Sequence, residues 1–311
     1  MRTPSPAPVV LPKVSVVVPT YRRPVSLRRA LEALGRQDPP PHEVIVAVFD
    51  EADRAPAEAG STRLVTSRRK GAGAQRNAGW QAATGELIAF TDDDCVVEPG
   101  WLGALTAPFS DPSVGLVQGT TLPLEPPGRM TRGMAVSTET GLYESCNIAY
   151  RRAALCEVEG FDETFPDRFS GRPFGEDADL AWRVKRRGWS SRFVPEAVVH
   201  HEVVPGGLRE LVKEEWRRGM FPGLVAAVPE LRSQLPWGGW MLRRQSPWAQ
   251  LALVGSILSV AAPGPGLVLA LPYCVWLRGL RADHIPFQVV RDLVGSVALA
   301  VGSVRARTLL L

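Results

Sequence analysis

Three consecutive aspartates follow a short apolar segment of the chain. Residues Ile88–Phe90 predict a buried strand, and Asp92, Asp93 and Asp94 come shortly after it. In open α/β sheets, ligands bind beyond the carboxyl ends of the strands. Adjacent carboxylates repel one another unless a cation lies between them, and such oxygen ligands suit Mg²⁺ or Mn²⁺ better than Zn²⁺. The run therefore indicates either a metal site that would hold phosphate oxygens or a solvated acidic turn.

Two later groups could also do chemistry. Glu176 and Asp177 open a predicted helix, where the helix dipole favours acids and where an acid beside a cleft could act as a general base. His200 and His201 end a predicted strand. Neighbouring side chains on a strand face opposite ways, so only one of them would reach a metal; the alternative is a surface histidine with a hydrogen bond.

Polar and cationic residues at other element ends could bind a nucleotide. Tyr21 could stack on a base, and Arg22 or Arg23 beside it could meet a phosphate. Asp50, at the end of a strand, could accept a hydrogen bond from a base or a ribose. Arg76, one turn into a glycine-rich helix start, could point at a diphosphate. Taken singly, each has a plainer explanation as a surface aromatic, a turn or a closely packed helix.

Alternating strand and helix patterns must position these residues. We expect strands at 14–18, 43–49, 62–66, 88–91, 114–119, 146–150, 191–194 and 197–199. We expect helices at 25–36, 71–84, 101–109, 151–158, 174–187 and 208–221. Residues 120–144 show no period and are expected to form a mobile loop. The alternation predicts an α/β fold with a mostly parallel central sheet.

Composition limits the class of protein. The 311 residues are 45% hydrophobic and 22% charged, which is typical of a globular protein. Residues 1–12 have no apolar segment of the kind found in a signal peptide. Cys95, Cys146, Cys156 and Cys274 form no CxxC pair, which indicates reduced thiols in a cytosolic setting. No nucleic-acid-binding motif is present, so we expect no nucleic-acid partner.

The C-terminal third differs from the rest. Up to Val204 there are 24 Lys and Arg against 26 Asp and Glu, a net of −2; the remainder has 12 against 6, a net of +6. Residues 248–262 and 267–277 are apolar on either side of a Pro-Gly-Pro-Gly break, and 285–304 predict an amphipathic helix. Neither apolar run is long enough to cross the ~30 Å hydrocarbon core of a bilayer. We expect an interfacial or re-entrant helix pair at an anionic membrane surface, the alternative being a buried hairpin.

Seven motifs stand in a fixed order that resembles family 2 glycosyltransferases. They are Val-Pro-Thr-Tyr-Arg-Arg (18–23), Asp50, Gln-Arg-Asn-Ala-Gly (75–79), Thr-Asp-Asp-Asp (91–94), Gly-Phe-Asp-Glu (160–163), Gly-Glu-Asp-Ala-Asp-Leu (175–180) and His201. The resemblance covers residues 13–204 and implies the GT-A fold, a Rossmann-like sandwich. Residues 205–311 would then form a helical, partly apolar extension.

The resemblance implies a nucleotide-sugar donor, a divalent metal, Mn²⁺ or Mg²⁺, and inversion at the anomeric carbon. The residues that it places at the donor are Pro19, Thr20, Tyr21, Arg23, Asp50, Arg76, Asn77, Asp92 and Asp93. Those that it places at the metal are Asp94, Asp92 and His201, and the general base would be Asp177, with Glu176 as second choice. The stretch after Phe49 departs from the family pattern, which leaves UDP-, GDP- and TDP-sugars open as donors.

The sequence says less about the acceptor and the cellular location of the protein. A sugar, a lipid-linked molecule or a small molecule could accept the sugar. The basic, apolar tail favours a cytoplasmic protein at the inner face of the cell membrane. Two alternatives remain: a catalytically silent nucleotide-sugar-binding scaffold, and a sugar nucleotidyltransferase. The second would need a glycine-rich loop with Arg and Lys after the first strand, and residues 19–24 are not one.

Overall fold

A computed structural model describes residues 12–49, 62–128, 130–131, 133–165 and 174–311, so Asp50 lies outside the described residues. The chain divides into two compact units. Unit 1 takes residues up to Thr121, Glu144–Phe161 and Arg183–His200. Unit 2 takes Leu122–Tyr143, Asp162–Trp182 and His201–Leu311. The boundary predicted near residue 204 lies close to the last of these divisions, but unit 2 also includes two segments from within 13–204.

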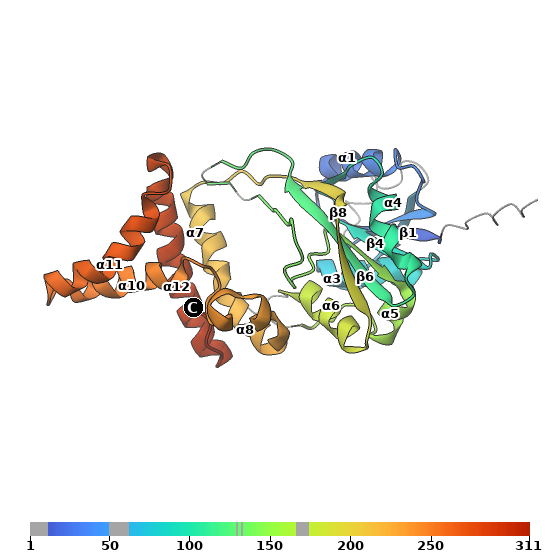
Figure 1. The fold of residues 1–311 in the computed structure, drawn as a ribbon. Coiled ribbons are helices and arrows are strands. Elements are labelled where there is room, and N and C mark those ends of the chain that lie inside the picture. Colours follow the sequence, from blue (N-terminus) through green and yellow to red (C-terminus); the bar gives the residue numbers. More distant parts are fainter. Residues whose placement is uncertain (1–11, 50–61, 129, 132, 166–173) are drawn as a thin grey trace, which may run out of the picture. The chain divides into compact units, whose positions relative to one another are not determined.

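An eight-stranded mixed sheet has the order β3-β2-β1-β4-β7-β6-β8-β5; Figure 1 labels its strands β1, β4, β6 and β8. The half β3-β2-β1-β4 is parallel, and β7 pairs antiparallel with β4 and β6. The strands are β1 (Val14–Pro19), β2 (Glu43–Val48), β3 (Thr62–Thr66), β4 (Leu87–Thr91), β5 (Cys95–Val97), β6 (Val114–Pro123), β7 (Asn147–Arg151) and β8 (Ser190–His201). Every residue of β1 and β4 is buried, as expected for central strands of a sheet.

Helices alternate with these strands along the chain. They are α1 (Pro24–Leu34), α3 (Ala72–Ala82), α4 (Trp101–Thr106) with the 3₁₀ turn η2 (Ala107–Ser110), α5 (Arg152–Glu157) and α6 (Glu176–Arg186). Of these, α1, α3, α4 and α5 contact strands of the sheet. Helix α3 contacts β1, β2 and β3. A Cβ atom on Gly79 would lie 2.3 Å from Val17, so only glycine allows α3 to approach β1 this closely.

Unit 2 ends in a group of helices. They are α7 (Leu208–Trp216), η3 (Arg217–Met220), α8 (Phe221–Ala227), η4 (Pro229–Gln234), α9 (Pro236–Gly239), α10 (Ser246–Leu258), α11 (Pro263–Leu277), η5 (Ala282–His284) and α12 (Ile285–Ala306). Helix α12 packs against α7, η3, α8 and α10. Its Asp292 is buried and accepts hydrogen bonds from Tyr273 and Gln288 at 2.9 and 2.8 Å.

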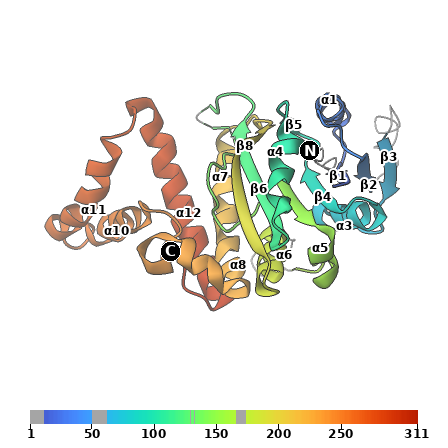
Figure 2. The ribbon, with the colours of Figure 1, turned by 45° about the vertical axis from the view of Figure 1, so that its right-hand side comes forward.

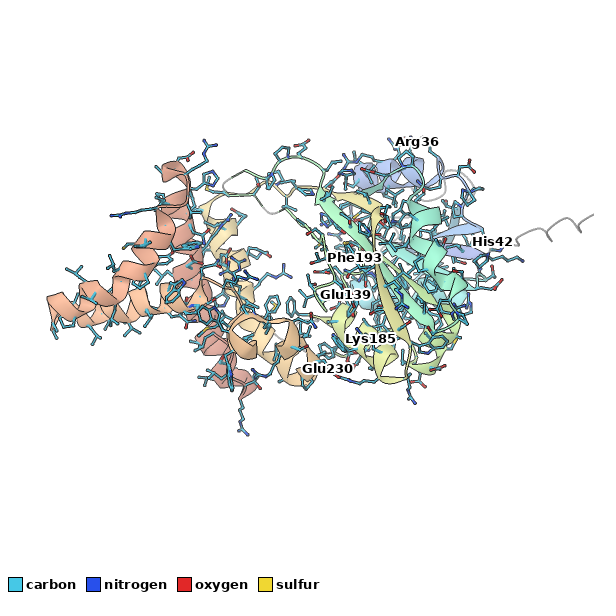
Figure 3. All side chains as sticks on the ribbon, in the orientation of Figure 1. Arg36, His42, Glu139, Lys185, Phe193 and Glu230 are labelled. Carbon is cyan, nitrogen blue, oxygen red and sulfur yellow. The ribbon has the colours of Figure 1, made fainter. Side chains whose placement is uncertain are left out.

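Helices α10 and α11 form a hairpin (Figure 2), and apolar side chains lie on its outside. Val260 is 90% exposed, and Ile257, Leu267 and Val268 are 66 to 68% exposed; side chains stand out along both helices (Figure 3). The hairpin is therefore not a buried one within the described residues. One segment of the described chain, Ala282–Ala306, is long and apolar enough to cross a membrane by length and composition, and 33% of its apolar window is buried.

Proline residues account for two differences from the predicted elements. Helix α11 already begins at Pro263, because proline is tolerated in the first turn of a helix, so the chain reverses at residues 259–262 instead of at the Pro-Gly repeat. The two strands predicted around Pro195 form one strand, β8. Strand β6 also continues to Pro123, four residues into the predicted loop.

Candidate functional site

The carboxyl ends of β1, β2 and β4 meet at one edge of the sheet because these strands are parallel. Thr20 follows β1, and its hydroxyl donates a 2.7 Å hydrogen bond to a carboxylate oxygen of Asp93, which follows β4. The Gln75 side chain donates to the carbonyl oxygens of Thr20 and Ala47 at 2.5 and 2.9 Å. Residues from three strands and α3 are thereby fixed at the edge where the sequence predicts a ligand.

The three aspartates have different partners in spite of their adjacency. Asp92 forms an ion pair with Arg76 at 2.7 Å. Asp93 pairs with Arg23 at 3.3 Å, and Asp94 pairs with the same guanidinium. Asp93 and Asp94 are each 5% exposed. Two guanidinium groups thus supply the positive charge that the adjacent carboxylates need.

Burial and charge alter the protonation of this group. Burial raises the pKa of Asp93 to about 6, although the Thr20 hydrogen bond and the Arg23 charge oppose the change. Burial would lower the pKa of Arg23, but the charges of Asp94 and Asp93 outweigh it and leave that pKa raised. An additional cation at this edge would therefore be stabilised by the carboxylates.

Asp94, Cys95 and His201 each offer a ligand atom, and these atoms lie within 4.8 Å of one another. His201 is the last residue of β8, and its Nδ1 atom hydrogen-bonds with the Glu202 carbonyl oxygen at 2.9 Å. Such a bond orients the ring of a metal-ligating histidine. His200 instead bonds with Glu98 at 2.7 Å. Of the two candidate histidines, the structure places His201 near the aspartates.

Cys95 is a member of this group that the sequence argument used only as evidence of a reducing compartment. Its position directly after the three aspartates is the signal that could have identified it. Burial, together with the neighbouring Cys146, holds the pKa of the Cys95 thiol well above its usual range. A neutral thiol is a poor metal ligand, so Asp94 and His201 are the better ligands. Asp92, also predicted as a ligand, is outside the group and pairs with Arg76.

Tyr21 lies among cations at the end of β1. The Lys70 ammonium lies 4.4 Å from the centre of the Tyr21 ring and donates a 3.1 Å hydrogen bond to its hydroxyl. The Arg22 guanidinium lies 5.1 Å from the ring centre. Pro19, the last residue of β1, is buried. The ring and the cations are of the types that bind a base and phosphates, and base stacking on Tyr21 stays a prediction.

Asn77 connects α3 to the segment after α5. Its amide donates to the Phe161 carbonyl oxygen at 2.8 Å and accepts from the Phe161 N–H at 2.9 Å. Gly160 beside it has φ +72°, and a Cβ atom there would lie 2.5 Å from Trp80. The structure thus gives Asn77 a role in the fold, and its predicted place near the donor is untested. Arg76, the preceding residue, lies over the Phe161 ring at 5.7 Å.

The two candidate bases lie in the first turn of α6. Glu176 and Asp177 are both half-buried, whereas Ala178 behind them is fully buried in the apolar core of unit 2. Gly175, with φ +84°, precedes the helix, and a Cβ atom there would lie 2.5 Å from Leu224. Packing therefore fixes the start of α6, where the two half-buried carboxylates lie.

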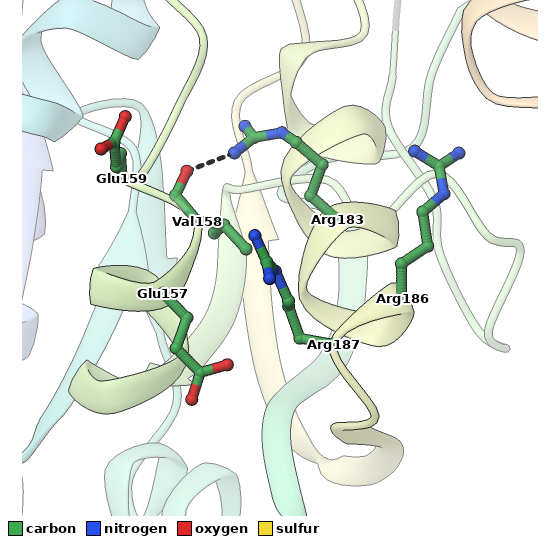
Figure 4. A pocket seen from close by; sticks show the side chains of 6 residues that line it. All are labelled: Glu157, Val158, Glu159, Arg183, Arg186 and Arg187. Carbon is green, nitrogen blue, oxygen red and sulfur yellow. Dashed lines mark hydrogen bonds between the residues drawn. The ribbon is translucent and has the colours of Figure 1, made fainter.

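One cleft of the described chain lies away from these residues. It has a volume of about 480 Å³ and lies between the end of α5 and the last turns of α6 (Figure 4). Arg183 in this cleft donates to the carbonyl oxygens of Val158 and Gly160 at 2.6 and 2.7 Å, which is a structural role. None of the predicted site residues lines the cleft.

Comparison with known proteins agrees with the motifs. A family model described as "Glycosyl transferase family 2" matches residues 15–155. The "Pre-mycofactocin glycosyltransferase" of Mycobacterium tuberculosis is 30% identical over an alignment of 213 residues that covers 61% of this chain and 42% of that protein. The "Glucosyl-dolichyl phosphate glucuronosyltransferase" of Haloferax volcanii is 30% identical over an alignment of 218 residues that covers 61% of this chain and 69% of that protein. The chain thus spans less than half the length of the mycobacterial relative.

A solved structure is similar over most of the chain. It is described as "Mannosyltransferase PcManGT from Pyrobaculum calidifontis in complex with GDP-Man and Mn2+". The TM-score is 0.56 at 21% identity, and the match covers 94% of this chain and 89% of that one. This likeness confirms the predicted GT-A fold class.

Proposed function

The chain belongs to glycosyltransferase family 2, and we propose that it transfers a sugar from a nucleotide-sugar donor to an acceptor hydroxyl with inversion at the anomeric carbon. The observation that carries the proposal is the edge where Thr20 and Asp92–Asp94 meet between Arg23 and Arg76. Carboxylates and cations at one edge of the sheet suit a ligand that has both hydroxyl groups and phosphates. The relatives with 30% identity, both named as glycosyltransferases, support the reaction class.

Asp94 and His201 would hold a divalent cation, Mn²⁺ or Mg²⁺. An oxygen and a nitrogen ligand that lie close together fit such an ion. When bound, the metal supplies positive charge to the diphosphate leaving group. Arg23, which pairs with Asp93 and Asp94 in the structure, is positioned to release these carboxylates and to bind a phosphate oxygen. Asp92 and Arg76 would orient the ribose and the diphosphate.

Asp177 would act as the general base. The acceptor oxygen forms a bond to the anomeric carbon while the bond from that carbon to the diphosphate oxygen breaks. The acceptor proton passes to the Asp177 carboxylate, and the nucleoside diphosphate leaves as an anion. A single base is enough, because the leaving group needs no proton.

The α10–α11 hairpin supports a place at a membrane surface. Its exposed apolar side chains and the net charge of +6 after Val204 suit an anionic lipid surface. We place the protein in the cytoplasm, peripheral on the inner face of the cell membrane. The acceptor would be a sugar, a lipid-linked molecule or a small molecule.

A donor screen tests this function. UDP-, GDP- and TDP-sugars would each be incubated with the protein and Mn²⁺, and release of the nucleoside diphosphate would be measured. We expect turnover of one nucleotide class, loss of turnover in EDTA, recovery with Mn²⁺ or Mg²⁺, and little turnover by Asp94→Asn. Full activity in EDTA would overturn the metal assignment.

The same screen separates the alternatives. Pyrophosphate release from a nucleoside triphosphate and a sugar phosphate would indicate a nucleotidyltransferase. Binding of a nucleotide sugar without turnover, for every donor and acceptor tried, would indicate a silent scaffold.

A further inference from the structure

Unit 2 contains a cavity of about 260 Å³ that the proposed function leaves unassigned. Its walls come from the segment before residue 143, from η3 and α8, and from the chain between η4 and α10. Ligand pockets for whole small molecules are usually about 300–1,000 Å³. This cavity therefore has room for one part of a ligand.

The lining is largely apolar. Phe221 and Val225 line it from α8, and Leu231, Leu235 and Leu242 line it from the following chain. Phe221, Leu235 and Leu242 are only half-buried, so their apolar surface is partly open. A hydrocarbon chain that covered this surface would contribute about 25 cal/mol per Å² of apolar area removed from water.

Two arginines give the cavity a positive side. Arg218 is 8% exposed and forms an ion pair with Glu215, which also faces Arg291 at 3.8 Å. Arg243 is exposed, and among the described residues its guanidinium has no ion pair within 4.0 Å. Burial and then the Arg243 charge lower the pKa of Arg218 to about 10. Glu215 and Asp292, the latter 4.0 Å from Arg218, offset the charges of Arg218 and Arg291. Arg243 adds a further positive charge at this side of the cavity, and a bound anion would be stabilised by it.

The surroundings of Arg243 suit a lipid surface. Trp237 and Trp240 precede it and are 51% and 52% exposed. Half-exposed tryptophans are typical of residues at the level of lipid headgroups. The apolar hairpin begins at Ser246, three residues after Arg243. A phosphate on Arg243 would thus lie beside residues that favour the membrane interface.

Helix α8 connects the cavity to the predicted base. Its Phe221 and Val225 line the cavity, and its Leu224 packs against Gly175, two residues before Asp177. Leu224 and Ala178 also belong to one apolar cluster. A ligand in the cavity therefore contacts the helix on which the start of α6 rests.

We propose that this cavity holds the part of a lipid phosphate's apolar chain that lies next to the phosphate, that Arg243 binds the phosphate, and that this lipid carries the acceptor hydroxyl. The proposal rests on the proposed function and names its acceptor class. The cavity anchors the acceptor by its chain and its phosphate, and the reacting hydroxyl lies on the part of the acceptor beyond the phosphate.

Binding of geranyl phosphate to the full chain, measured by calorimetry, tests the site. We expect saturable binding, with geraniol and inorganic phosphate each binding at least about tenfold more weakly, since each lacks one of the two contacts. Arg243→Ala should weaken geranyl phosphate binding about tenfold and leave geraniol unchanged, because a hydrogen bond to a charged group is lost. Arg244→Ala is the matched control: Arg244 is exposed, adjacent and outside the cavity lining, and it should bind like the wild type.

Three outcomes would overturn the site: no saturable binding of geranyl phosphate up to about 1 mM, equal binding of inorganic phosphate, or equal losses in Arg243→Ala and Arg244→Ala. Leu235→Trp, which fills the cavity, should also weaken geranyl phosphate and geraniol binding.

The donor screen tests the proposed function independently of the cavity. If the donor is turned over but geranyl phosphate does not bind, the cavity proposal is wrong and the proposed enzyme activity stands. If geranyl phosphate binds in an Arg243-dependent way but no donor is turned over, both the acceptor assignment and the proposed function are wrong.

Discussion

Adjacent residues of one type take separate roles at this site. Asp92 pairs with Arg76, Asp93 accepts from Thr20, and Asp94 lies near His201. The sequence predicts a carboxylate cluster at the end of a strand, because strand period and turn composition are local properties. It cannot predict which aspartate meets which cation, since Thr20 and Arg23 lie about 70 residues earlier in the chain.

The first prediction at this scale concerns the general base. Asp177→Asn should lower the transfer rate by about 10²–10⁴-fold, the usual contribution of a general base, and leave donor binding nearly unchanged. Single-turnover kinetics and donor titration would measure the two quantities. Glu176→Gln, in the same helical turn, is the matched control and should retain most of the activity. If Asp177→Asn is as fast as the wild type while Glu176→Gln is slow, the base is Glu176.

The second prediction at this scale concerns Arg23, whose guanidinium pairs with Asp94. A metal at Asp94 must compete with that charge, so Arg23→Gln should bind Mn²⁺ several-fold more tightly in the absence of nucleotide. Mn²⁺ titration followed by electron paramagnetic resonance would measure this. Arg22→Gln, at the adjacent position, is the control and should bind Mn²⁺ like the wild type. Weaker Mn²⁺ binding by Arg23→Gln than by the control would contradict the competition.

At the scale of elements, most strands and helices of residues 13–204 follow from periodicity. Strand β5 (Cys95–Val97), directly after the three aspartates, is one that the sequence pattern does not predict. Pro195 lies within the continuous strand β8, although proline usually ends or borders a strand. These two differences depend on pairing between strands, which the local sequence does not contain. Pro263, in the C-terminal third, begins α11, where its missing N–H has no cost.

Glu43 provides a prediction about these elements. Its carboxylate accepts from the Ser15 hydroxyl on β1 at 2.7 Å and from the Thr84 backbone and hydroxyl at 2.6 Å. Burial alone would raise the pKa of Glu43, but the Thr84 and Ser15 hydrogen bonds outweigh it and lower that pKa below 4.5. Glu43→Gln should therefore lower the free energy of unfolding by about 1–2 kcal/mol at neutral pH.

The lowered pKa of Glu43 also predicts how the stability difference between wild type and Glu43→Gln changes with pH. A carboxyl whose pKa is lowered in the folded protein stabilises the fold above its unfolded pKa, and this contribution disappears as the pH falls through the folded pKa. The difference between wild type and Glu43→Gln should thus shrink below about pH 4.5. Urea unfolding at several pH values would measure it, with exposed Glu32→Gln as a control within about 0.5 kcal/mol. A difference that grows on acidification would contradict the assignment.

At the scale of the whole chain, the basic excess and the exposed apolar surface occur in the same third of the sequence. The net charge of +6 follows Val204, and α10, α11 and α12 lie there too. Removing everything after residue 247 would also remove α12, which packs against α7 and α8. Charge substitutions on the hairpin therefore test membrane association with less damage to unit 2.

We expect the full chain to sediment with phosphatidylglycerol liposomes, and we expect salt to weaken this binding without abolishing it, because apolar burial is not screened. The double variant Val260→Asp, Val268→Asp should bind at least roughly 100-fold more weakly. It loses two apolar contacts of about 1.5 kcal/mol each and introduces two anions facing anionic lipid.

Val25→Asp is the matched control, since Val25 is 77% exposed on α1 in unit 1; it should sediment like the wild type. If the wild type does not sediment with liposomes, or if the double variant sediments with them as the control does, the hairpin does not contact the membrane. A soluble acceptor would then fit the protein better than a lipid.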